Sequence, residues 1–457
     1  MNIRFCLLIA FLLSSAFGQS IVGRISGTVT DSSRSVIANA VINITDEETK
    51  LTRTLKTDSN GFYVATALPV GNYTVAVEHA GFKKAARSGN NLAADGRVTV
   101  DFALQIGDVT ASVEVIEAAG EQVNTVSGEV SRVIDSQQVQ SMALNGRNYM
   151  QLVSLIPGAA LLDEDQLALT TSLSITAQSV NGNRGNTNYL SIDGGSNMDS
   201  GSNGSQVNNV GIDFIREVNI KSSNFSAEFG RNSGSSINVV TKGGGDQFHG
   251  GAFEFLRNEI LDAKNYFAPI KGALRYNNFG WNLGGPIKRG KLFFFAGQEY
   301  KRIRKLTDPV RRTVPTNAEL AGDFSKRSGN LYYPGTTQPV PNRNISALIV
   351  PDGKAVANAY NNMKSIAALY TDTTTGNNIT HQVSNPFNWR QEIIRADYKV
   401  SDSNNVYFRY LHDNYDLIEP YGTFFSSNLP MTPYQTQSPR LWLPDQQYLD
   451  AARQYGK

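Results

Sequence analysis

Strand-length segments in the second half of the sequence alternate between apolar and polar residues. Their apolar positions are Phe279, Trp281 and Leu283; Ile394, Ala396, Tyr398 and Val400; and Val406, Phe408 and Tyr410. The opposite positions include Asn278, Arg395 and Arg409. Because successive side chains of a β-strand point to opposite faces, each segment would carry one apolar and one polar face. A β-protein can satisfy its backbone in lipid only as a closed barrel with apolar faces outward, so the pattern predicts transmembrane strands.

Three consecutive glycines, at 243–245, mark a change of environment along the chain. Before them, residues 236–241 form a largely apolar run that suits a strand buried in a soluble domain. Behind them, Phe253 and Phe255 alternate with Ala252 and Glu254. We therefore expect a buried domain to end at the glycines, and the transmembrane strands to begin behind a flexible connection.

The first 18 residues have the features of an export signal. Arg4 supplies a positive start, residues 5–13 are apolar, and small residues stand at Ala16 and Gly18, so we expect cleavage after Gly18. The apolar run is too short for a permanent membrane anchor. Cys6 is the single cysteine of the sequence and lies in this segment, so the exported chain would contain no disulfide and no cysteine metal site.

The remaining composition argues against several function classes. The sequence has 42 basic and 40 acidic residues, a net charge of +2, so we expect no nucleic-acid partner. No zinc spacing surrounds any histidine, at His79, His249, His381 or His412. Residues 285–291 imitate a phosphate loop, but Leu292 replaces its Ser or Thr, and we interpret them as a turn, like residues 58–61. We therefore expect no catalytic residue, no metal, no cofactor and no enzymatic activity.

The first domain, expected at 21–107, has the pattern of a small antiparallel β-sandwich. Ile42 and Ile44 alternate with polar residues, as do Tyr73, Val75 and Val77. Three segments resemble the carboxypeptidase regulatory-like domain: Ile25–Asp31, Thr57–Tyr63 and Leu68–Val75. That family has a transthyretin-like or carbohydrate-binding-like β-sandwich fold. The resemblance implies the fold, without peptidase activity.

Motifs around the three glycines carry a second resemblance. Phe225–Arg231, Ile237–Lys242 and Gln247–Gly250 are similar to the plug end and first barrel strand of TonB-dependent, Oar-like outer-membrane receptors. The resemblance implies a mainly β protein: the sandwich, a linker at 108–120, an α/β plug at 121–245 and barrel strands at 246–457. It also implies a location in the outer membrane, with the sandwich in the periplasm, and lipid and the TonB complex as partners.

Two groups of residues are candidates for the functional contacts that the resemblance implies. An extended segment can add as a strand to a partner sheet, so the candidate TonB-contacting stretch is Val113, Glu114, Val115, Ile116 and Glu117. Arg184 and Arg231 are candidate ligand-binding residues of the plug; the alternative is structural pairing with carboxylates such as Glu228. A glycan, a siderophore, a peptide and a protein all remain open as the extracellular ligand.

Five barrel strands are expected, near 248–257, 276–284, 291–301, 389–400 and 405–415. A Gly-Gly-Pro turn at 284–286 and a turn at 401–405 would face the periplasm, and a long extracellular loop at 302–388 would hold a short helix near 355–369. Phe293–Phe295 suits an aromatic girdle, or else a buried core. A barrel that encloses a plug needs about 22 strands, so we expect a truncated barrel that does not transport by itself.

The leading function is therefore energy-coupled uptake through an outer-membrane receptor. The alternative is a surface adhesin or carbohydrate-binding outer-membrane protein without transport. An exported hydrolase is disfavoured, because the sequence offers no catalytic constellation.

Overall fold

The computed structural model describes residues 22–107, 114–117, 128–161, 178–419 and 434–437, except 200, 202, 205, 228, 231, 265, 267–270, 307, 308, 383, 402 and 403. The chain divides into two compact units. The first comprises Met1–Ala252, Gly280–Glu299 and Gln391–Asp413, and the second comprises Phe253–Phe279, Tyr300–Arg390 and Asn414–Lys457.

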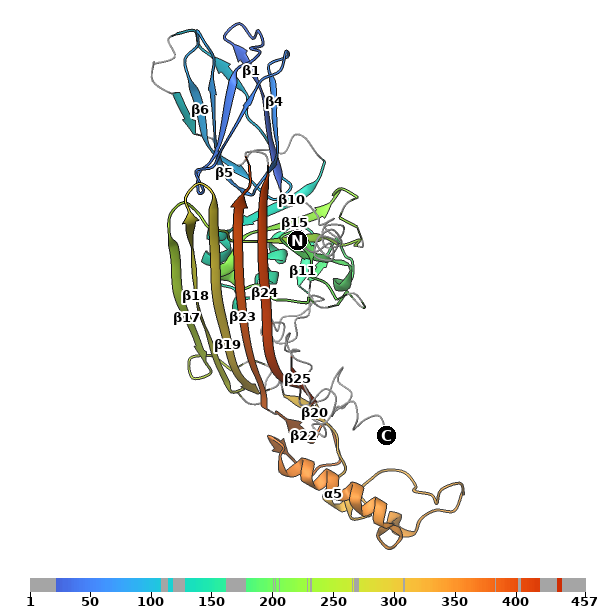
Figure 1. Ribbon diagram of the computed structural model, residues 1–457. Helices are drawn as coiled ribbons and strands as arrows, with labels where there is room; N and C mark the ends of the chain where they lie inside the picture. The colour runs from blue at the N-terminus through green and yellow to red at the C-terminus, as the bar shows by residue number, and fades with distance from the viewer. Residues whose placement is uncertain are drawn as a thin grey trace, which may run out of the picture. The chain divides into compact units, whose positions relative to one another are not determined.

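The N-terminal part is a β-sandwich of two sheets (Figure 1). One sheet has the order β4-β1-β7, with β8 also paired to β1; the other has the order β3-β2-β5-β6-β9. The strands are β1 (Gly23–Asp31), β2 (Val41–Asp46), β3 (Thr52–Lys56), β4 (Phe62–Leu68), β5 (Gly71–Glu78), β6 (Ala85–Leu92), β7 (Arg97–Thr99), β8 (Phe102–Leu104) and β9 (Glu114–Glu117). The apolar positions of the predicted alternation, including Ile42, Ile44, Val75 and Val77, are buried between the sheets.

The middle domain, from Gly128 to Lys242, combines a five-stranded sheet with short helices. The sheet has the order β10-β15-β16-β13-β14. Its strands are β10 (Val130–Asp135), β13 (Tyr189–Ile192), β14 (Gly195–Ser196), β15 (Ile215–Ser223) and β16 (Ser236–Thr241). Strands β11 (Ala159–Leu161) and β12 (Gln178–Val180) pair separately, and the helical segments are α2 (Ser136–Ser141), η1 (Asn145–Arg147), η2 (Tyr149–Leu155), η3 (Gly185–Thr187) and η4 (Ile212–Phe214). The buried core includes Ile134, Leu152, Phe214, Ile220 and Val239.

Strand β15 is the centre of this sheet and pairs antiparallel with β10 on one side and β16 on the other. Val130, at the start of β10, lies beside Ser223 at the end of β15. Thr241, at the end of β16, lies beside Ile215 at the start of β15. The domain's entry and exit strands are therefore parallel to each other, with their outer ends at opposite edges of the sheet.

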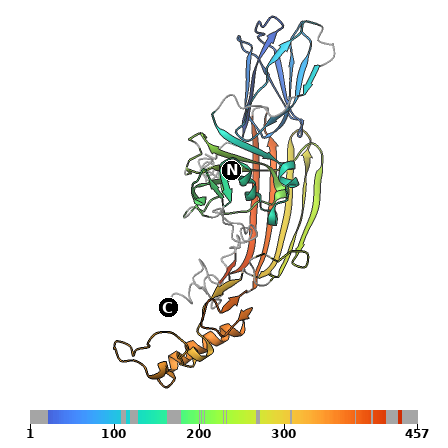
Figure 2. The same cartoon turned by 180° about the vertical axis from the view of Figure 1, so that it is seen from behind.

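The long-strand sheet contains β17 (His249–Asn258), β18 (Leu274–Lys288), β19 (Leu292–Leu306), β23 (Ser384–Lys399), β24 (Asn405–Glu419) and β25 (Tyr434–Gln437), in that order (Figures 1 and 2). It is an open sheet, as expected for part of a barrel. The predicted faces are confirmed: Trp281, Ile394 and Phe408 are 44%, 51% and 63% exposed, whereas Asn278 and Arg395 are buried. The chain is therefore mainly β, as the sequence predicts.

The first turn of this sheet differs from the expectation. Gly284, Gly285 and Pro286 belong to β18, and the turn lies at 289–290, where Lys291 N–H donates to the Lys288 carbonyl (3.0 Å). Phe293 and Phe295 are buried, so they do not form an aromatic girdle. Their position on β19 points them to the same face as the other buried residues of that strand, and Phe295 packs edge-on against Phe214, with ring centroids 6.2 Å apart.

The connection between β19 and β23 is shorter and more ordered than expected, because both strands extend into the predicted loop. It contains β20 (Val310–Arg312), α4 (Asn317–Leu320), η5 (Pro341–Arg343), η6 (Ser346–Leu348), α5 (Pro351–Ser365), β21 (Leu369–Tyr370) and β22 (Ile379–His381). The three strands form a small sheet of order β20-β22-β21, and α5 corresponds to the expected short helix. Within the described residues, no helix has the length and apolar character needed to cross a membrane.

The link from β16 to β17 is packed and does not behave as a free spacer. A Cβ on Gly244 would lie 2.4 Å from the Phe294 carbonyl oxygen, 2.7 Å from the Phe294 nitrogen and 2.9 Å from the Gly285 carbonyl oxygen. Gly244 therefore lets two backbones approach closely, and the expectation of a flexible connection at this residue is wrong. The expected separation holds, since β16 and β17 lie in different sheets.

Candidate functional site

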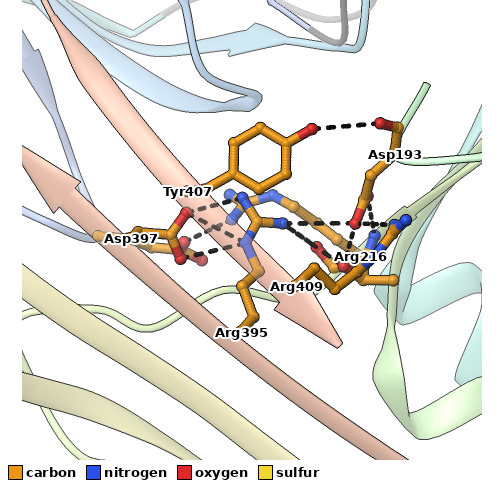
Figure 3. Close-up of polar contacts among 8 residues, drawn as sticks. Asp193, Arg216, Arg395, Asp397, Tyr407 and Arg409 are labelled. Carbon is orange, nitrogen blue, oxygen red and sulfur yellow. Dashed lines mark hydrogen bonds and ion pairs between the residues drawn. The ribbon is translucent and has the colours of Figure 1, made fainter. Parts of the chain in front are cut away.

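The contact between the middle domain and the long-strand sheet is centred on the carboxylate of Asp193 (Figure 3). Asp193 follows β13 in a tight turn with a φ of 45°, and its side chain is fully buried. Its Oδ1 accepts the backbone N–H of Thr241 (2.7 Å), and its Oδ2 accepts the Thr241 hydroxyl (2.5 Å). The turn after β13 and the end of β16 thus hold the carboxylate in place.

Two arginines of the long-strand sheet face this carboxylate. Arg409 Nη1, on β24, lies 2.5 Å from Asp193 Oδ2. Arg395, on β23, lies 3.9 Å from the same oxygen, donates to the Thr241 carbonyl (3.0 Å) and pairs with Asp397 (2.9 Å). Figure 3 also shows the Tyr407 hydroxyl directed at the Asp193 carbonyl (3.4 Å).

The charges of this cluster are balanced, with two guanidinium groups against the carboxylates of Asp193 and Asp397. A buried carboxylate is costly unless it is paired and hydrogen-bonded, and Asp193 meets both conditions. Removal of one partner would leave an unpaired buried charge. We call this cluster of Asp193, Arg395, Asp397 and Arg409 the polar lock, because it joins the middle domain to the long-strand sheet.

A network of amide groups makes a second contact between the middle domain and the long-strand sheet. Gln391 Oε1, on β23, accepts the backbone N–H of Gly211 (2.9 Å), and its Nε2 donates to Asp413 Oδ1 (2.6 Å). Asp413 Oδ2 in turn accepts the N–H of Asn209 (2.7 Å). All these groups are buried or nearly so, so the loop before η4 is also fixed to β23 and β24.

The sandwich contacts the middle domain through the loop at Ala94 and Asp95. Glu217 Oε1 accepts the Ala94 N–H (2.8 Å), and Asn219 Nδ2 donates to the Ala94 carbonyl (2.9 Å). Lys221 Nζ pairs with Asp95 (2.8 Å). Burial raises the pKa of the Glu217 carboxyl to about 7, so this contact contains a group that titrates near neutral pH.

A cavity of about 360 Å³ lies where sandwich, middle domain and long-strand sheet meet. Its charged lining residues are Asp46, Glu48, Arg53, Arg216, Arg395, Asp397 and Lys399. Arg216 Nη1 pairs with Glu48 (2.7 Å) inside this lining. The cavity is therefore lined by both signs of charge.

Of the sequence-predicted site residues, the structure describes Arg184 and residues 114–117. The Arg184 side chain is exposed, and its carbonyl accepts the Thr187 N–H (3.0 Å) at the start of η3. Arg231, its alternative partner Glu228, Val113 and the cleavage residue Gly18 lie outside the described residues. Glu114, Val115, Ile116 and Glu117 form β9, which pairs parallel with β6 of the sandwich, Ala86 lying beside Val115.

The sequence alone does not identify Asp193 as the partner of the inward arginines. Its local signal, Asp193-Gly194-Gly195, is typical of a turn and assigns no role to the carboxylate. Among the residues that the structure describes, no group of three or more His, Cys, Asp or Glu side chains could hold a metal ion.

Comparison with known protein families matches two parts of the chain. Residues 24–105 match the carboxypeptidase regulatory-like domain, and residues 240–441 match the outer membrane beta barrel domain. The sequence is 30% identical over 347 residues to the TonB-dependent transporter Oar of Myxococcus xanthus. That alignment covers 70% of this chain and 31% of the transporter, so the chain spans about a third of the length of this relative.

Solved structures similar to this chain include a siderophore receptor and an outer membrane transporter. The siderophore receptor PirA from Acinetobacter baumannii is 14% identical, with 67% of this chain and 43% of the receptor covered and a TM-score of 0.35. The outer membrane transporter YddB from Escherichia coli is 13% identical, with 63% and 32% covered and a TM-score of 0.34.

Proposed function

This chain is an outer-membrane protein that joins a carboxypeptidase regulatory-like domain to an outer-membrane β-barrel domain, and we propose that it serves TonB-dependent uptake of a ligand from the cell surface. The observation that carries the proposal is the buried lock between Asp193 of the middle domain and Arg395 and Arg409 of the long-strand sheet. The relative from Myxococcus xanthus, a TonB-dependent transporter, supports the same function.

In this proposal the middle domain is the plug of the barrel, and the lock keeps it seated. Separating the two parts would expose Asp193, Arg395 and Arg409 without their partners, at a cost of several kcal/mol. Thermal fluctuations alone would rarely supply this free energy, whereas a force transmitted from the inner membrane could supply it. The lock therefore suits a transporter that opens only when energy is supplied.

The TonB contact is proposed at residues 113–117. β9 offers a precedent within the chain, because Glu114–Glu117 already adds as a strand to β6. The same backbone groups would pair with a strand of TonB, as extended peptides do with exposed sheet edges. β9 must then leave β6 before TonB can bind, which makes the sandwich a competitor for this segment.

The ligand is proposed to bind on the extracellular side, with Arg184 and Arg231 as the first candidates to test. The exposed side chain of Arg184 is compatible with this role. A glycan, a siderophore, a peptide or a protein would each find hydrogen-bonding partners there. We further propose that the chain is not an enzyme, in keeping with a relative that is a transporter.

A surface adhesin or a carbohydrate-binding protein is the second candidate, supported by the sandwich domain. TonB binding separates the two functions. The purified chain, and a variant that lacks residues 114–117, would be titrated with the periplasmic domain of TonB by biolayer interferometry. Uptake predicts binding that the deletion abolishes, while an adhesin without transport predicts no binding by either protein. Binding that survives the deletion would move the contact elsewhere.

A further inference from the structure

Four arginines lie on three neighbouring strands of the long-strand sheet. They are Arg275 on β18, Arg302 and Arg304 on β19, and Arg390 on β23. All four are exposed. By the strand alternation they share the face of the exposed residues Phe279 and Ile394, which is the outward face of the barrel. We call these four residues the arginine row.

Hydrogen bonds between the strands bring the row together. At the two ends of the β18–β19 pair, Lys291 N–H donates to the Lys288 carbonyl (3.0 Å) and Leu306 N–H to the Ala273 carbonyl (3.1 Å). Both bonds give an antiparallel register in which Arg275 lies opposite Arg304.

The row continues onto β23. The N–H of Lys399 donates to the Lys291 carbonyl (2.9 Å), a register that places Arg390 opposite Tyr300, two residues from Arg302. Arg304 Nη1 also donates to Asn388 Oδ1 on β23 (2.9 Å). On β17, the N–H of Glu259 donates to the Leu274 carbonyl (2.8 Å), so Arg257 lies opposite the buried Tyr276 and belongs to the inward face.

Like charges directly opposite each other destabilise a sheet, so the row calls for a counter-charge. Arg304 contacts an amide, and the guanidinium of Arg302 lies over the Tyr300 ring, 5.9 Å from its centroid. Neither of these contacts neutralises a positive charge.

The row lies where the apolar part of each strand ends. On β18, Arg275 precedes Phe279 by four residues, about 13 Å along the strand, and on the antiparallel β19 Arg302 follows Tyr300 by two. Short turns of such barrels face the periplasm and long connections face outside, so this half of each strand points to the outer leaflet. Arginine just beyond an apolar and aromatic belt is placed to meet lipid headgroups.

We propose that the arginine row binds the phosphate groups of anionic lipids in the outer leaflet. Guanidinium groups bind phosphate through two parallel N–H donors, and neighbouring arginines on adjacent strands can share one phosphate. The apolar residues below the row would contact the acyl chains of the same lipid. The site is separate from the polar lock and does not depend on TonB.

The test uses the 457-residue chain purified in nonionic detergent. Lipid A with both phosphates is added, and the bound lipid is counted by native mass spectrometry. The variant R275Q/R302Q/R304Q removes three charges of the row. The control K288Q/R289Q/K291Q removes three charges from the turn at the opposite end of the same strands. Circular dichroism establishes that both variants retain their β-structure.

We expect the row variant to lose at least five-fold in lipid occupancy and the control to match the unchanged chain. Dephosphorylated lipid A should bind the unchanged chain as weakly as intact lipid A binds the row variant. Equal occupancy of the row variant and the control would overturn the proposal, as would undiminished binding of the dephosphorylated lipid. Displacement of lipid A by millimolar inorganic phosphate would assign the row to free anions and reject the lipid.

Discussion

The carboxylate of Asp193 lies 2.5 Å from the guanidinium of Arg409, and the two residues are 216 positions apart in the sequence. The pair joins the turn after β13 in the middle domain to β24 of the long-strand sheet. Because the pair is buried, breaking it costs more free energy than breaking an exposed ion pair of the same geometry, since water cannot replace a lost partner.

Replacing Asp193 with Asn should therefore destabilise the seated middle domain. Two guanidinium groups would lose their shared carboxylate, which predicts a loss of about 3–5 kcal/mol in the free energy of unfolding of this domain. Hydrogen exchange of the Thr241 amide, which donates to Asp193, reports the change directly. The control D352N makes the same substitution at an exposed residue of α5 and should shift this exchange little. Equal exchange in both variants would contradict a locking role.

Replacing Gly244 with Ala should strain the link between β16 and β17. The added Cβ would lie 2.4 Å from the Phe294 carbonyl oxygen, and backbone on both sides must move, at a cost of about 1–3 kcal/mol. Gly251 is the matched control, because a Cβ there meets nothing within 4 Å. Thermal unfolding in detergent should show a lower melting temperature for G244A and an unchanged one for G251A. Equal melting temperatures of the two variants would refute the close packing at Gly244.

The contact of Glu217 with Ala94 should make stability depend on pH. Burial raises the folded-state pKa of Glu217 from 4.5 to about 7, so the folded chain binds the proton more tightly than the unfolded chain. The contribution is complete below about pH 4.5 and is lost as the pH rises through 7, by up to about 1.4 kcal/mol per pH unit. Urea unfolding at pH 5 and pH 8 measures this loss.

Glu217→Gln should remove that pH dependence while it keeps an oxygen to accept the Ala94 N–H. The variant should therefore equal the unchanged chain near pH 4.5 and exceed it in stability at pH 8. Glu254→Gln, at an exposed position, should leave the difference between the two pH values intact. If E217Q retains the full pH dependence, another group is responsible for it.

Holding β9 on β6 should prevent the proposed binding of TonB. Ala86 and Val115 are partners in the parallel register, so A86C/V115C can be joined by a short bifunctional thiol reagent. The linked protein should lose TonB binding, and reduction should restore it. Each single-cysteine variant, treated with the same reagent, should still bind. Full binding by the linked protein would show that β9 does not need to leave the sandwich.

Local patterns in the sequence predicted the strands and their faces. Residues such as Trp281 and Ile394 alternate with polar neighbours, and period-two alternation depends only on the geometry of a single strand. The sandwich was equally readable, because Ile42, Ile44 and Val75 belong to short runs between clear turns. In each case the information lies within about ten residues.

The candidate site could not be predicted in the same way, because its partners are distant in sequence. The inward direction of Arg395 and Arg409 follows from alternation, but nothing local connects them to Asp193. Gly244 was read as flexible because a glycine run suits a linker, whereas its close contact depends on the placement of Phe294. Phe293 and Phe295 were ambiguous, since lipid and a packed domain both accept aromatic side chains.

The arrangement of β10 and β16 around β15 determines how the middle domain would respond to a pull. The chain enters at Val130 and leaves at Thr241, at opposite ends of parallel strands. A force applied before Val130 and resisted beyond Thr241 would run along the strands, so it would load the hydrogen bonds of the two ladders in shear. Bonds loaded together share the tension, while a strand peeled from its end loses them one at a time. Under such a force the sheet should therefore stay intact longer than the side-chain contacts that attach it to the long-strand sheet. The middle domain should detach as a single body before it unfolds.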